Sequence, residues 1–165
     1  MSSGQTQLTI DAPQSDDAAC LARLFKEDMD DLGVETKLEE LEEVADAVID
    51  GMAQRPRRCL CWVARSGEVG EVVGVVLANF NWSLKFAGRS LWIETLYVTP
   101  SARRRGLGAE LVEHLLDWAE AHEIKGIDLE AYQGNTPASI LYRSFGFERL
   151  GRERFYFRLQ GSGYL

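Results

Sequence analysis

The sequence predicts a single mixed α/β domain in which a central sheet is flanked by helices. At 165 residues, the chain has the length of one domain and can bury a core. Apolar residues make up 45% and charged residues 27%, an ordinary composition for a globular protein. Segments of helical periodicity alternate with short apolar runs, a pattern typical of helices packed on a sheet. We therefore expect one domain covering residues 1–165.

The first half of the chain predicts strands and helices in a clear order. Leu21, Leu24, Phe25 and Met29 form an apolar stripe at helical spacing, and Gly33 is suited to end that helix. A second stripe, which includes Leu41 and Val48, predicts another helix. The expected helices are residues 15–32 and 37–54, and the expected strands are residues 8–11, 59–65 and 72–82.

The second half begins with a strand at residues 90–98, whose nearly continuous apolar run is typical of a central strand covered on both faces. The pattern then predicts helices at residues 106–123 and 135–146 and a strand at 127–132. Residues 147–159 predict a final hairpin or strand pair. The tails, residues 1–7 and 161–165, are expected to be flexible.

Charge and composition argue against several classes of protein. The net charge of −8 disfavours nonspecific binding to nucleic acid and favours a cationic small substrate. No apolar run approaches the ~18 residues that a membrane span needs, so we expect no membrane contact. Residues 1–7 carry neither a positive cluster nor an apolar stretch, so we expect a cytoplasmic protein without a secretory signal.

The cysteines and histidines do not indicate a metal site. Cys59 and Cys61 are two residues apart in an expected strand, so both point to one face. Burial as small apolar side chains explains them better than a metal or redox pair. A zinc site would need two more ligands nearby, and His114 and His122 fall on the charged side of an expected helix. No metal is implied.

An arginine–glycine turn, Arg-Arg-Arg-Gly-Leu-Gly at residues 103–108, lies between a buried strand and a helix. The glycines let the backbone approach a ligand, and the helix behind them offers free N–H groups and the positive end of its dipole. Three arginines at that end oppose the dipole by about 0.3–1 kcal/mol each unless an anion binds. The turn has neither the Gly-Lys-Ser/Thr of a P-loop nor the third glycine of a dinucleotide fingerprint. We expect a pyrophosphate site.

Residues 96–108, Leu-Tyr-Val-Thr-Pro-Ser-Ala-Arg-Arg-Arg-Gly-Leu-Gly, resemble the coenzyme A signature of the GNAT family of N-acetyltransferases, Val-x-Pro-x-x-Arg-x-x-Gly-x-Gly/Ala. The resemblance implies acetyl-CoA as cofactor and a mostly antiparallel twisted sheet of six to seven strands with about four helices. It also implies an oxyanion donor at the backbone N–H near Leu96. The implied contacts with acetyl-CoA are the backbone of Leu96, Tyr97 and Val98 and a cradle of Arg103, Arg104, Arg105, Gly106, Leu107, Gly108 and Ala109.

Residues 135–147 resemble a second marker of the same family, Asn-x-x-Ala/Ser-x-x-x-Tyr followed by Gly-Phe. By its residue type Asn135 suits the N-cap of a helix. The resemblance instead implies that it bonds the pantetheine arm, and we favour this contact with the ligand. Tyr142 lies on an apolar stripe, so it should face the interior. A core aromatic is one interpretation; the resemblance implies the acid that protonates the leaving thiolate. Tyr132 and Tyr156 are alternatives outside the motif position.

Glu94 is unusual because it interrupts an apolar strand, where a carboxylate is costly unless paired or functional. It could bond a neighbour, recognise a substrate ammonium or act as the base that deprotonates the amine. We expect substrate contact, with the role of base left open.

The local sequence around Glu94 and Asn135 is most similar to the diamine/spermidine N-acetyltransferases, which implies a polyamine-like acceptor. The resemblance to the GNAT family as a whole implies a homodimer. In the polyamine interpretation Asp28 and Asp31, from the acidic cluster of residues 27–31, and Trp82 contact the substrate. A solvated acidic face explains the cluster equally well. Aminoglycosides and peptide or protein amines also remain open, as does a module that binds acetyl-CoA without catalysis. Asp11 departs from the family, in which arginine is common after the first strand, and the segment from Gly151 onward is not recognisably of that branch.

Overall fold

The computed structural model describes residues 8–159. The chain divides into two compact units, Met1–Glu130 and Ala131–Leu165, which are described separately. The expected tails, residues 1–7 and 161–165, lie outside the described residues. The expectation of a single domain stays a prediction.

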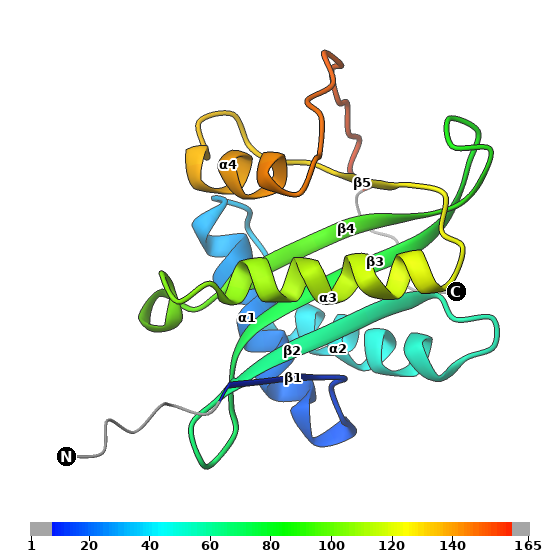
Figure 1. Cartoon of the computed structure of the whole chain (residues 1–165). Helices are drawn as coiled ribbons and strands as arrows, with labels where there is room; N and C mark the ends of the chain where they lie inside the picture. Colours follow the sequence, from blue (N-terminus) through cyan, green and yellow to red (C-terminus); the bar gives the residue numbers. More distant parts are fainter. Residues whose placement is uncertain (1–7, 160–165) are drawn as a thin grey trace. The chain divides into compact units, whose positions relative to one another are not determined.

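The first unit is built on one five-stranded sheet in the order β1-β2-β3-β4-β5 (Figure 1). Strands β1 to β4 are antiparallel neighbours, and β5 runs parallel to β4. Long apolar runs make β2 and β3 the buried centre of the sheet. The strand that the sequence predicted to be central, residues 90–98, is β4, which lies between β3 and the three-residue β5. The strands are β1 Leu8–Asp11, β2 Cys59–Ser66, β3 Glu71–Ser83, β4 Gly88–Val98 and β5 Ile127–Leu129.

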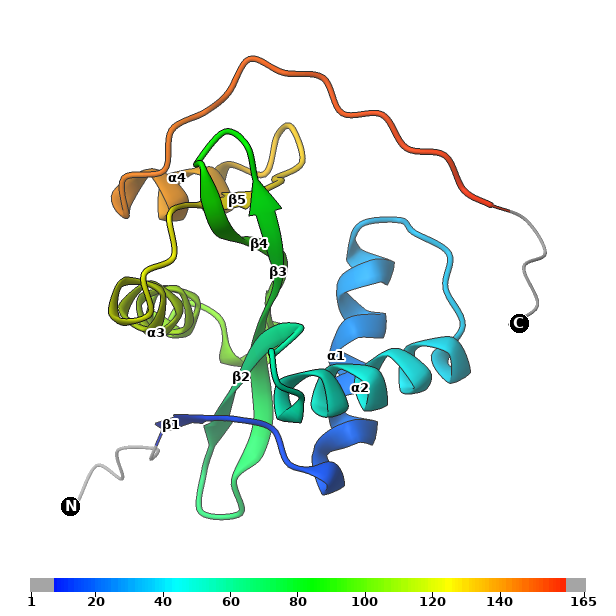
Figure 2. The same cartoon turned by 90° about the vertical axis from the view of Figure 1, so that its right-hand side faces the viewer.

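Helices cover both faces of this sheet (Figures 1 and 2). One core cluster joins α1 and α2 to β2, β3 and β4, and it includes Cys59 and Cys61 as buried apolar side chains. On the opposite face, α3 packs against Trp62 and Phe80 through Trp118. These helices are α1 Ala18–Asp31, α2 Leu38–Ala53 and α3 Leu107–Ala121, and two short 3₁₀ turns occupy Ser15–Asp17 and Pro100–Ala102. None of the helices in residues 8–159 combines the length and apolarity that crossing a membrane requires.

The second unit contains α4, Thr136–Ser144, and no other regular element within its described residues. Its partly buried side chains include Ala138, Leu141, Tyr142 and Phe145, the stripe that the sequence predicts. The predicted hairpin is absent: residues 147–159 form neither helix nor strand. The aromatic side chains of Phe155, Tyr156 and Phe157 are 85–90% exposed, so they lack the covered face that stabilises a strand.

The fold class is therefore confirmed, and the strand count is corrected. The described residues form five strands, not six to seven, because residues 147–159 add none. The expectation of about four helices agrees with α1 to α4, and the predicted boundaries lie within about three residues of those observed. The fifth strand is shorter than predicted, ending at Leu129 rather than Tyr132.

A β-bulge at Glu94 interrupts the pairing of β3 with β4. Leu77 lies opposite Thr95 and Ala78 lies opposite Ile93, so Glu94 has no partner residue on β3. Such an extra residue bends its strand and re-aims the neighbouring side chains. Thr95 consequently faces α1, whereas Ile93 shares the face of Ala78, toward α3. The exposed carboxylate of Glu94 thus avoids the burial that its place in the sequence suggested.

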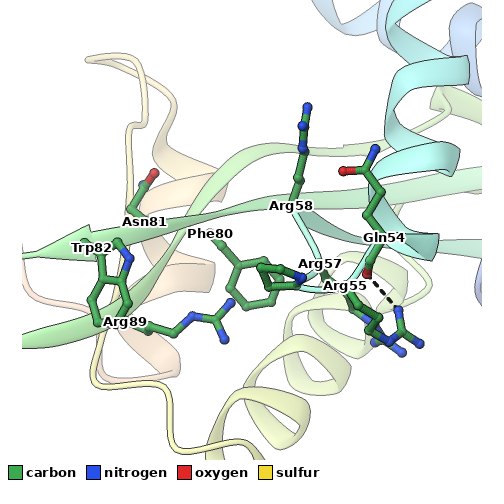
Figure 3. A pocket seen from close by; sticks show the side chains of 9 residues that line it. Gln54, Arg55, Arg57, Arg58, Phe80, Asn81, Trp82 and Arg89 are labelled. Carbon is green, nitrogen blue, oxygen red and sulfur yellow. Dashed lines mark hydrogen bonds between the residues drawn. The ribbon is translucent and has the colours of Figure 1, made fainter.

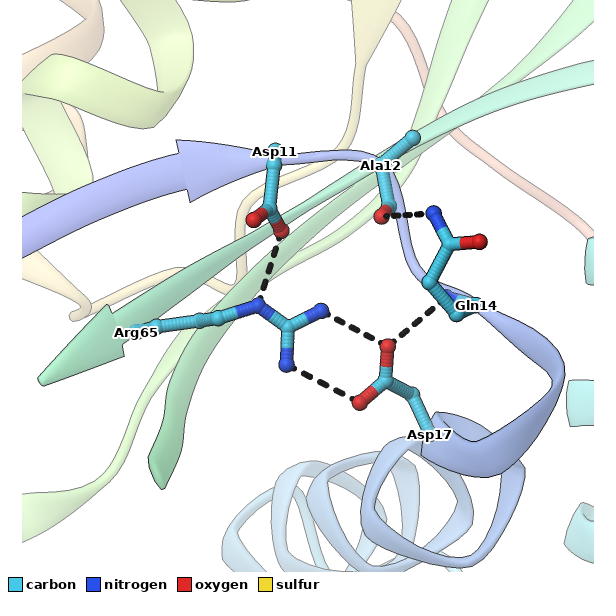
Figure 4. A network of polar contacts seen from close by, with 5 residues as sticks. All are labelled: Asp11, Ala12, Gln14, Asp17 and Arg65. Carbon is cyan, nitrogen blue, oxygen red and sulfur yellow. Dashed lines mark hydrogen bonds and ion pairs between the residues drawn. The ribbon is translucent and has the colours of Figure 1, made fainter. Parts of the chain in front are cut away.

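Arg65 at the end of β2 ties β1 to the start of α1 (Figure 4). Its guanidinium donates two hydrogen bonds to Asp17, of 2.9 and 2.7 Å, and its Nε donates to Asp11 at 2.9 Å. The hydrogen bond from Arg65 is the main cause that lowers the pKa of Asp17 below its ordinary value of 3.8. Asp11 is therefore an acceptor for the arginine of the neighbouring strand.

Replacing Arg65 with alanine is expected to lower the free energy of unfolding by about 1–3 kcal/mol, because Asp17, only 14% exposed, would lose its charged partner. The pairing stabilises the fold above pH 3.8, and its contribution disappears as the pH falls through the lower folded-state pKa. Urea unfolding at pH 7 measures the change. Lys26→Ala, which removes a more exposed pair with Asp30, should change stability by about 0.5 kcal/mol or less. Equal losses in the two variants would contradict a special role for Arg65.

Candidate active site

The backbone of β4 has an open edge beyond Ile93. Strand β5 pairs with Leu91, Trp92 and Ile93 and extends no further along β4. The N–H of Thr99 donates to the carbonyl of Val73 at 2.9 Å, so Thr99 and Val73 form a hydrogen-bonded pair of the antiparallel ladder. Alternation along the ladder then turns the N–H and C=O groups of Leu96 and Val98 away from β3. These are the backbone groups from which the sequence predicted contact with the pantetheine arm.

The turn after β4 leads into α3 with its amides unused. Gly106, at the N-cap of α3, has φ +79°, and Arg104 has φ +65°, a conformation that is strained for a residue with a side chain. No side chain caps the helix. Within residues 8–159, the first helical backbone bond in this turn runs from the Glu110 N–H to the Gly106 carbonyl, at 3.0 Å. The N–H groups of Leu107, Gly108 and Ala109 are therefore available to an anion.

The arginines of this turn divide into two kinds. Arg103 is bound within the unit: it donates to the Val98 carbonyl at 2.8 Å, pairs with Asp31 at 3.0 Å and lies 5.4 Å from the Tyr97 ring centroid. Arg104 and Arg105 make no ion pair in the described part of the chain. They and the helix amides fit a diphosphate, whereas the Arg103 side chain and the Asp31 carboxylate already satisfy each other.

Tyr97 belongs to the core cluster beneath α1 and α2, where it is 6% exposed. Burial, with the negative charges of Asp31 and Glu27, raises the pKa of Tyr97 to about 12. Its side chain is thus a neutral core group, and the same alternation turns its backbone N–H and C=O toward β3, unlike those of Leu96 and Val98.

Two carboxylates meet β4 at the bulge. Glu94 is exposed there, and the hydroxyl of Thr95, the next residue, donates to Asp28 on α1 at 2.5 Å. Asp28 forms no ion pair within the described residues. The structure thus brings Asp28 to the same stretch of strand as Glu94, although 66 positions separate them in the sequence. The sequence analysis did not identify Thr95 as a site residue. The available signal was a threonine next to a charged residue within an apolar strand.

Burial raises the pKa of the Asp28 carboxyl above its ordinary value, and the nearby charge of Asp31 adds to that rise. The hydrogen bond from Thr95 and the positive charge of Arg103 oppose it. A half-buried carboxylate without a cation is costly to keep ionised, and an ammonium group bound beside it would remove that cost. This electrostatic setting suits a positively charged acceptor.

Trp82 does not lie with these carboxylates. It pairs with Arg89 at the far end of β4, five residues from Glu94. At ~3.3 Å per residue this is a separation of about 16 Å along the strand. The indole is 82% exposed. Trp82 therefore belongs to a different surface of the first unit.

In the second unit, Asn135 caps α4: its side-chain oxygen accepts a hydrogen bond from the Ala138 N–H at 3.3 Å. The capping role, which the sequence analysis ranked second, is thus present in this structure. Tyr142 is half-buried, and its ring meets Phe147 edge to face with centroids 5.7 Å apart. The contact fixes the Tyr142 ring against the Gly-Phe part of the motif.

Comparison with known proteins identifies the family. Residues 21–147 match the Acetyltransferase (GNAT) family. The chain belongs to the GNAT acetyltransferase family. The match includes most of α1, the whole of β4, the turn before α3 and the motif at Asn135, so the predicted site residues lie inside the family region.

Individual relatives cover less of the chain. N-alpha-acetyltransferase RimI of Mycobacterium tuberculosis is 39% identical over 70 residues, which cover 42% of each protein. The [Ribosomal protein bS18]-alanine N-acetyltransferase of Salmonella typhimurium is 42% identical over 65 residues, covering 39% of this chain and 44% of the relative. The chain thus spans less than half the length of either of these curated relatives. Such partial matches leave the acceptor undecided.

A solved structure extends the likeness to nearly the whole fold. Aminoglycoside N-acetyltransferase AAC(6')-Iy in complex with CoA superposes with a TM-score of 0.78 at 15% identity, covering 96% of this chain and 99% of that one. At that identity the likeness shows the GNAT fold alone. These three proteins are named for N-alpha, ribosomal-protein-alanine and aminoglycoside acetylation, so the diamine/spermidine branch stays a prediction.

Proposed function

We propose that this chain transfers an acetyl group from acetyl-CoA to a primary amine, by direct attack while both substrates are bound. The observation that carries the proposal is the anion site at the start of α3. Three free helix amides, the left-handed Gly106 and the side chains of Arg104 and Arg105 follow directly on the open backbone edge of β4. A strand edge for an amide-containing arm and a cradle for a diphosphate are the two features that acetyl-CoA requires.

Acetyl-CoA supplies a thioester, and the reaction yields an acetylated amine and the free CoA thiol. An ammonium group has three hydrogens and the amide product keeps one, so two protons must leave. We assign one to Glu94 or Asp28, which takes it directly or through water. Tyr142, at the motif position of the family, gives its own proton to the departing sulfur. The second proton from the amine then restores the Tyr142 hydroxyl. The Leu96 N–H, which points away from β3, donates to the carbonyl oxygen as negative charge builds.

The acceptor that we favour is a small cationic amine, because the exposed Glu94 and the Asp28 bound to its neighbour Thr95 both lie at the bulge of β4, and neither forms an ion pair within residues 8–159. A second candidate is the terminal amine of a peptide or protein, favoured by the 42% identity with the ribosomal-protein-alanine acetyltransferase. Both acceptors carry a positive charge before reaction, so the same carboxylates would serve either. A homodimer and a cytoplasmic location complete the proposal.

Asp28→Asn is expected to raise the KM for the amine about 10-fold or more, because a charge-assisted hydrogen bond to the ammonium becomes a neutral one. Binding of acetyl-CoA should not change. The raised folded-state pKa means that wild-type stability falls as pH rises from about 3.8 toward that pKa. The stability of the variant does not fall in this pH range, because the amide has no proton to lose, and the amide oxygen still accepts the hydrogen bond from Thr95. Its stability at pH 7 should therefore equal or exceed that of the wild type.

Steady-state kinetics and urea unfolding at pH 4 and pH 7 measure both effects. Asp30→Asn is the matched control, because Asp30 is an exposed carboxylate on the same helix that pairs with Lys26. Unchanged KM in Asp28→Asn would remove Asp28 from the acceptor site, and the comparison with Glu94→Gln would then decide whether Glu94 acts alone.

The proposed function is tested by calorimetric titration with acetyl-CoA and by a thiol-release assay over polyamines, aminoglycosides and peptides with free N-termini. Binding together with thiol release on one class confirms the activity and names the acceptor. Binding without release on any amine would favour a non-catalytic acetyl-CoA sensor. Absence of binding in a folded sample would refute the proposal.

A further inference from the structure

The far end of β4 borders a surface hollow of about 590 Å³ in the first unit (Figure 3). It lies between the turn after α2 and the β3–β4 hairpin. Its volume is within the range of sites that bind small molecules, ~300–1,000 Å³. The side chains that define its chemistry are Arg55, Arg57, Arg58, Phe80, Trp82 and Arg89.

Four arginines border this hollow on a chain whose net charge is −8. Arg55 donates to the carbonyls of Met52, Ala53 and Gln54 and so completes the end of α2. Arg57, Arg58 and Arg89 pair with no carboxylate within the described residues. Arg57 and Arg89 are half-buried, which concentrates their charge on the hollow. Unpaired guanidinium groups in such a position favour a phosphate or carboxylate.

Aromatic rings accompany these charges. Arg89 lies over the Phe80 ring at 4.5 Å from its centroid, a contact that holds the guanidinium beside the hollow that both residues line. The neighbouring Trp82 indole is 82% exposed, and it lies on the same side as Arg89 in Figure 3. An exposed indole beside arginines can stack on a planar ring while the arginines bind phosphate. The hollow thus offers complementary groups to both parts of a nucleotide.

Electrostatics decide between a compact ligand and a long one. The chain as a whole has 26 acidic and 18 basic residues, and four of the basic residues border the hollow. A single-stranded RNA would follow the protein surface beyond the hollow, where the remaining acidic excess repels its phosphates. A mononucleotide would meet only the arginine-rich part. The charge distribution therefore favours the small ligand.

The hollow is separate from the anion site at α3. Arg89 and Val98 are nine residues apart on β4, which corresponds to about 30 Å at ~3.3 Å per residue. The arginine–glycine turn begins only after Val98. A ligand in the hollow would leave the α3 amides free.

We propose that this hollow is a second ligand site, which binds a nucleoside phosphate with its base on Trp82 and its phosphates on Arg57 and Arg89. The site does not depend on the acetyl-transfer activity.

The test titrates ADP into the full chain saturated with CoA and follows heat and tryptophan fluorescence. ADP should bind at one site per chain and quench fluorescence, whereas adenosine or inorganic pyrophosphate alone should bind more weakly. Arg57→Gln combined with Arg89→Gln should weaken ADP binding about 10-fold or more, and Trp82→Ala about 5-fold or more. Arg149→Gln, an exposed arginine of the second unit, is the matched control and should not change it.

Thermal unfolding and CoA affinity show that each variant is folded. The proposal is overturned if ADP does not bind in the presence of CoA, or if the arginine and tryptophan variants bind it like the wild type. Tighter binding of a ten-nucleotide single-stranded RNA than of ADP would also overturn it, in favour of a nucleic-acid surface.

Discussion

Tyr142→Phe is expected to lower kcat about 100-fold or more while leaving the Kd for acetyl-CoA unchanged. The phenylalanine keeps the ring that packs edge to face on Phe147, so the fold of the second unit should be preserved. Only the hydroxyl is lost, and with it the proton for the departing sulfur; general acid catalysis contributes ~10²–10⁴-fold. Thiol release under saturating substrates measures kcat, and calorimetry measures binding.

The matched controls for Tyr142 are Tyr132→Phe and Tyr156→Phe, because both side chains are exposed and lie in the same unit. Neither should change kcat by more than about two-fold. If Tyr142→Phe retains full turnover, the hydroxyl is not the acid. If Tyr132→Phe or Tyr156→Phe loses turnover instead, the acid was assigned to the wrong tyrosine.

Reversing both free charges of the cradle, Arg104→Glu with Arg105→Glu, is expected to raise the Kd for acetyl-CoA about 100-fold or more. Each arginine would lose a charge-assisted bond of ~1.5–3 kcal/mol and place a carboxylate beside the diphosphate. The wild-type affinity should also fall as salt rises, and the variant should show a weaker salt dependence.

The control for this double variant is Arg149→Glu with Arg152→Glu, which changes the net charge equally at exposed positions of the second unit. An equal loss of affinity in the two double variants would mean that general charge, and not the cradle, governs binding. A normal Kd in the Arg104 and Arg105 variant would leave the helix amides as the main anion ligands.

Periodicity in the sequence was sufficient to place the helices. The apolar stripe of the predicted helix 106–123 is the face that α3 buries, with Leu111, Val112, Leu115 and Ala119, because a helix with one apolar stripe has one way to face a sheet. The turn before α3 was equally predictable, since glycine at 106 and arginines beside it constrain backbone and charge locally.

Features that depend on contacts between distant segments were not predictable. The pattern of β4 shows an acidic residue in an apolar run, but the bulge at Glu94 exists only in its register with β3. The approach of Asp28 to Thr95 requires α1 to pack on β4. Likewise, the alternation in residues 147–159 favours strands, yet a strand needs a paired neighbour, which local sequence cannot supply.

The bulge at Glu94 also bears on how this strand tolerates change. Ile93 and Thr95 already point to opposite faces, as adjacent residues of an uninterrupted strand do. Deleting Glu94 would therefore leave the same side chains packed on each face of the sheet. The sheet therefore carries one position that its own packing does not need. Such a position is free to vary with chemistry, so differences in acceptor among related chains can accumulate there without weakening the fold.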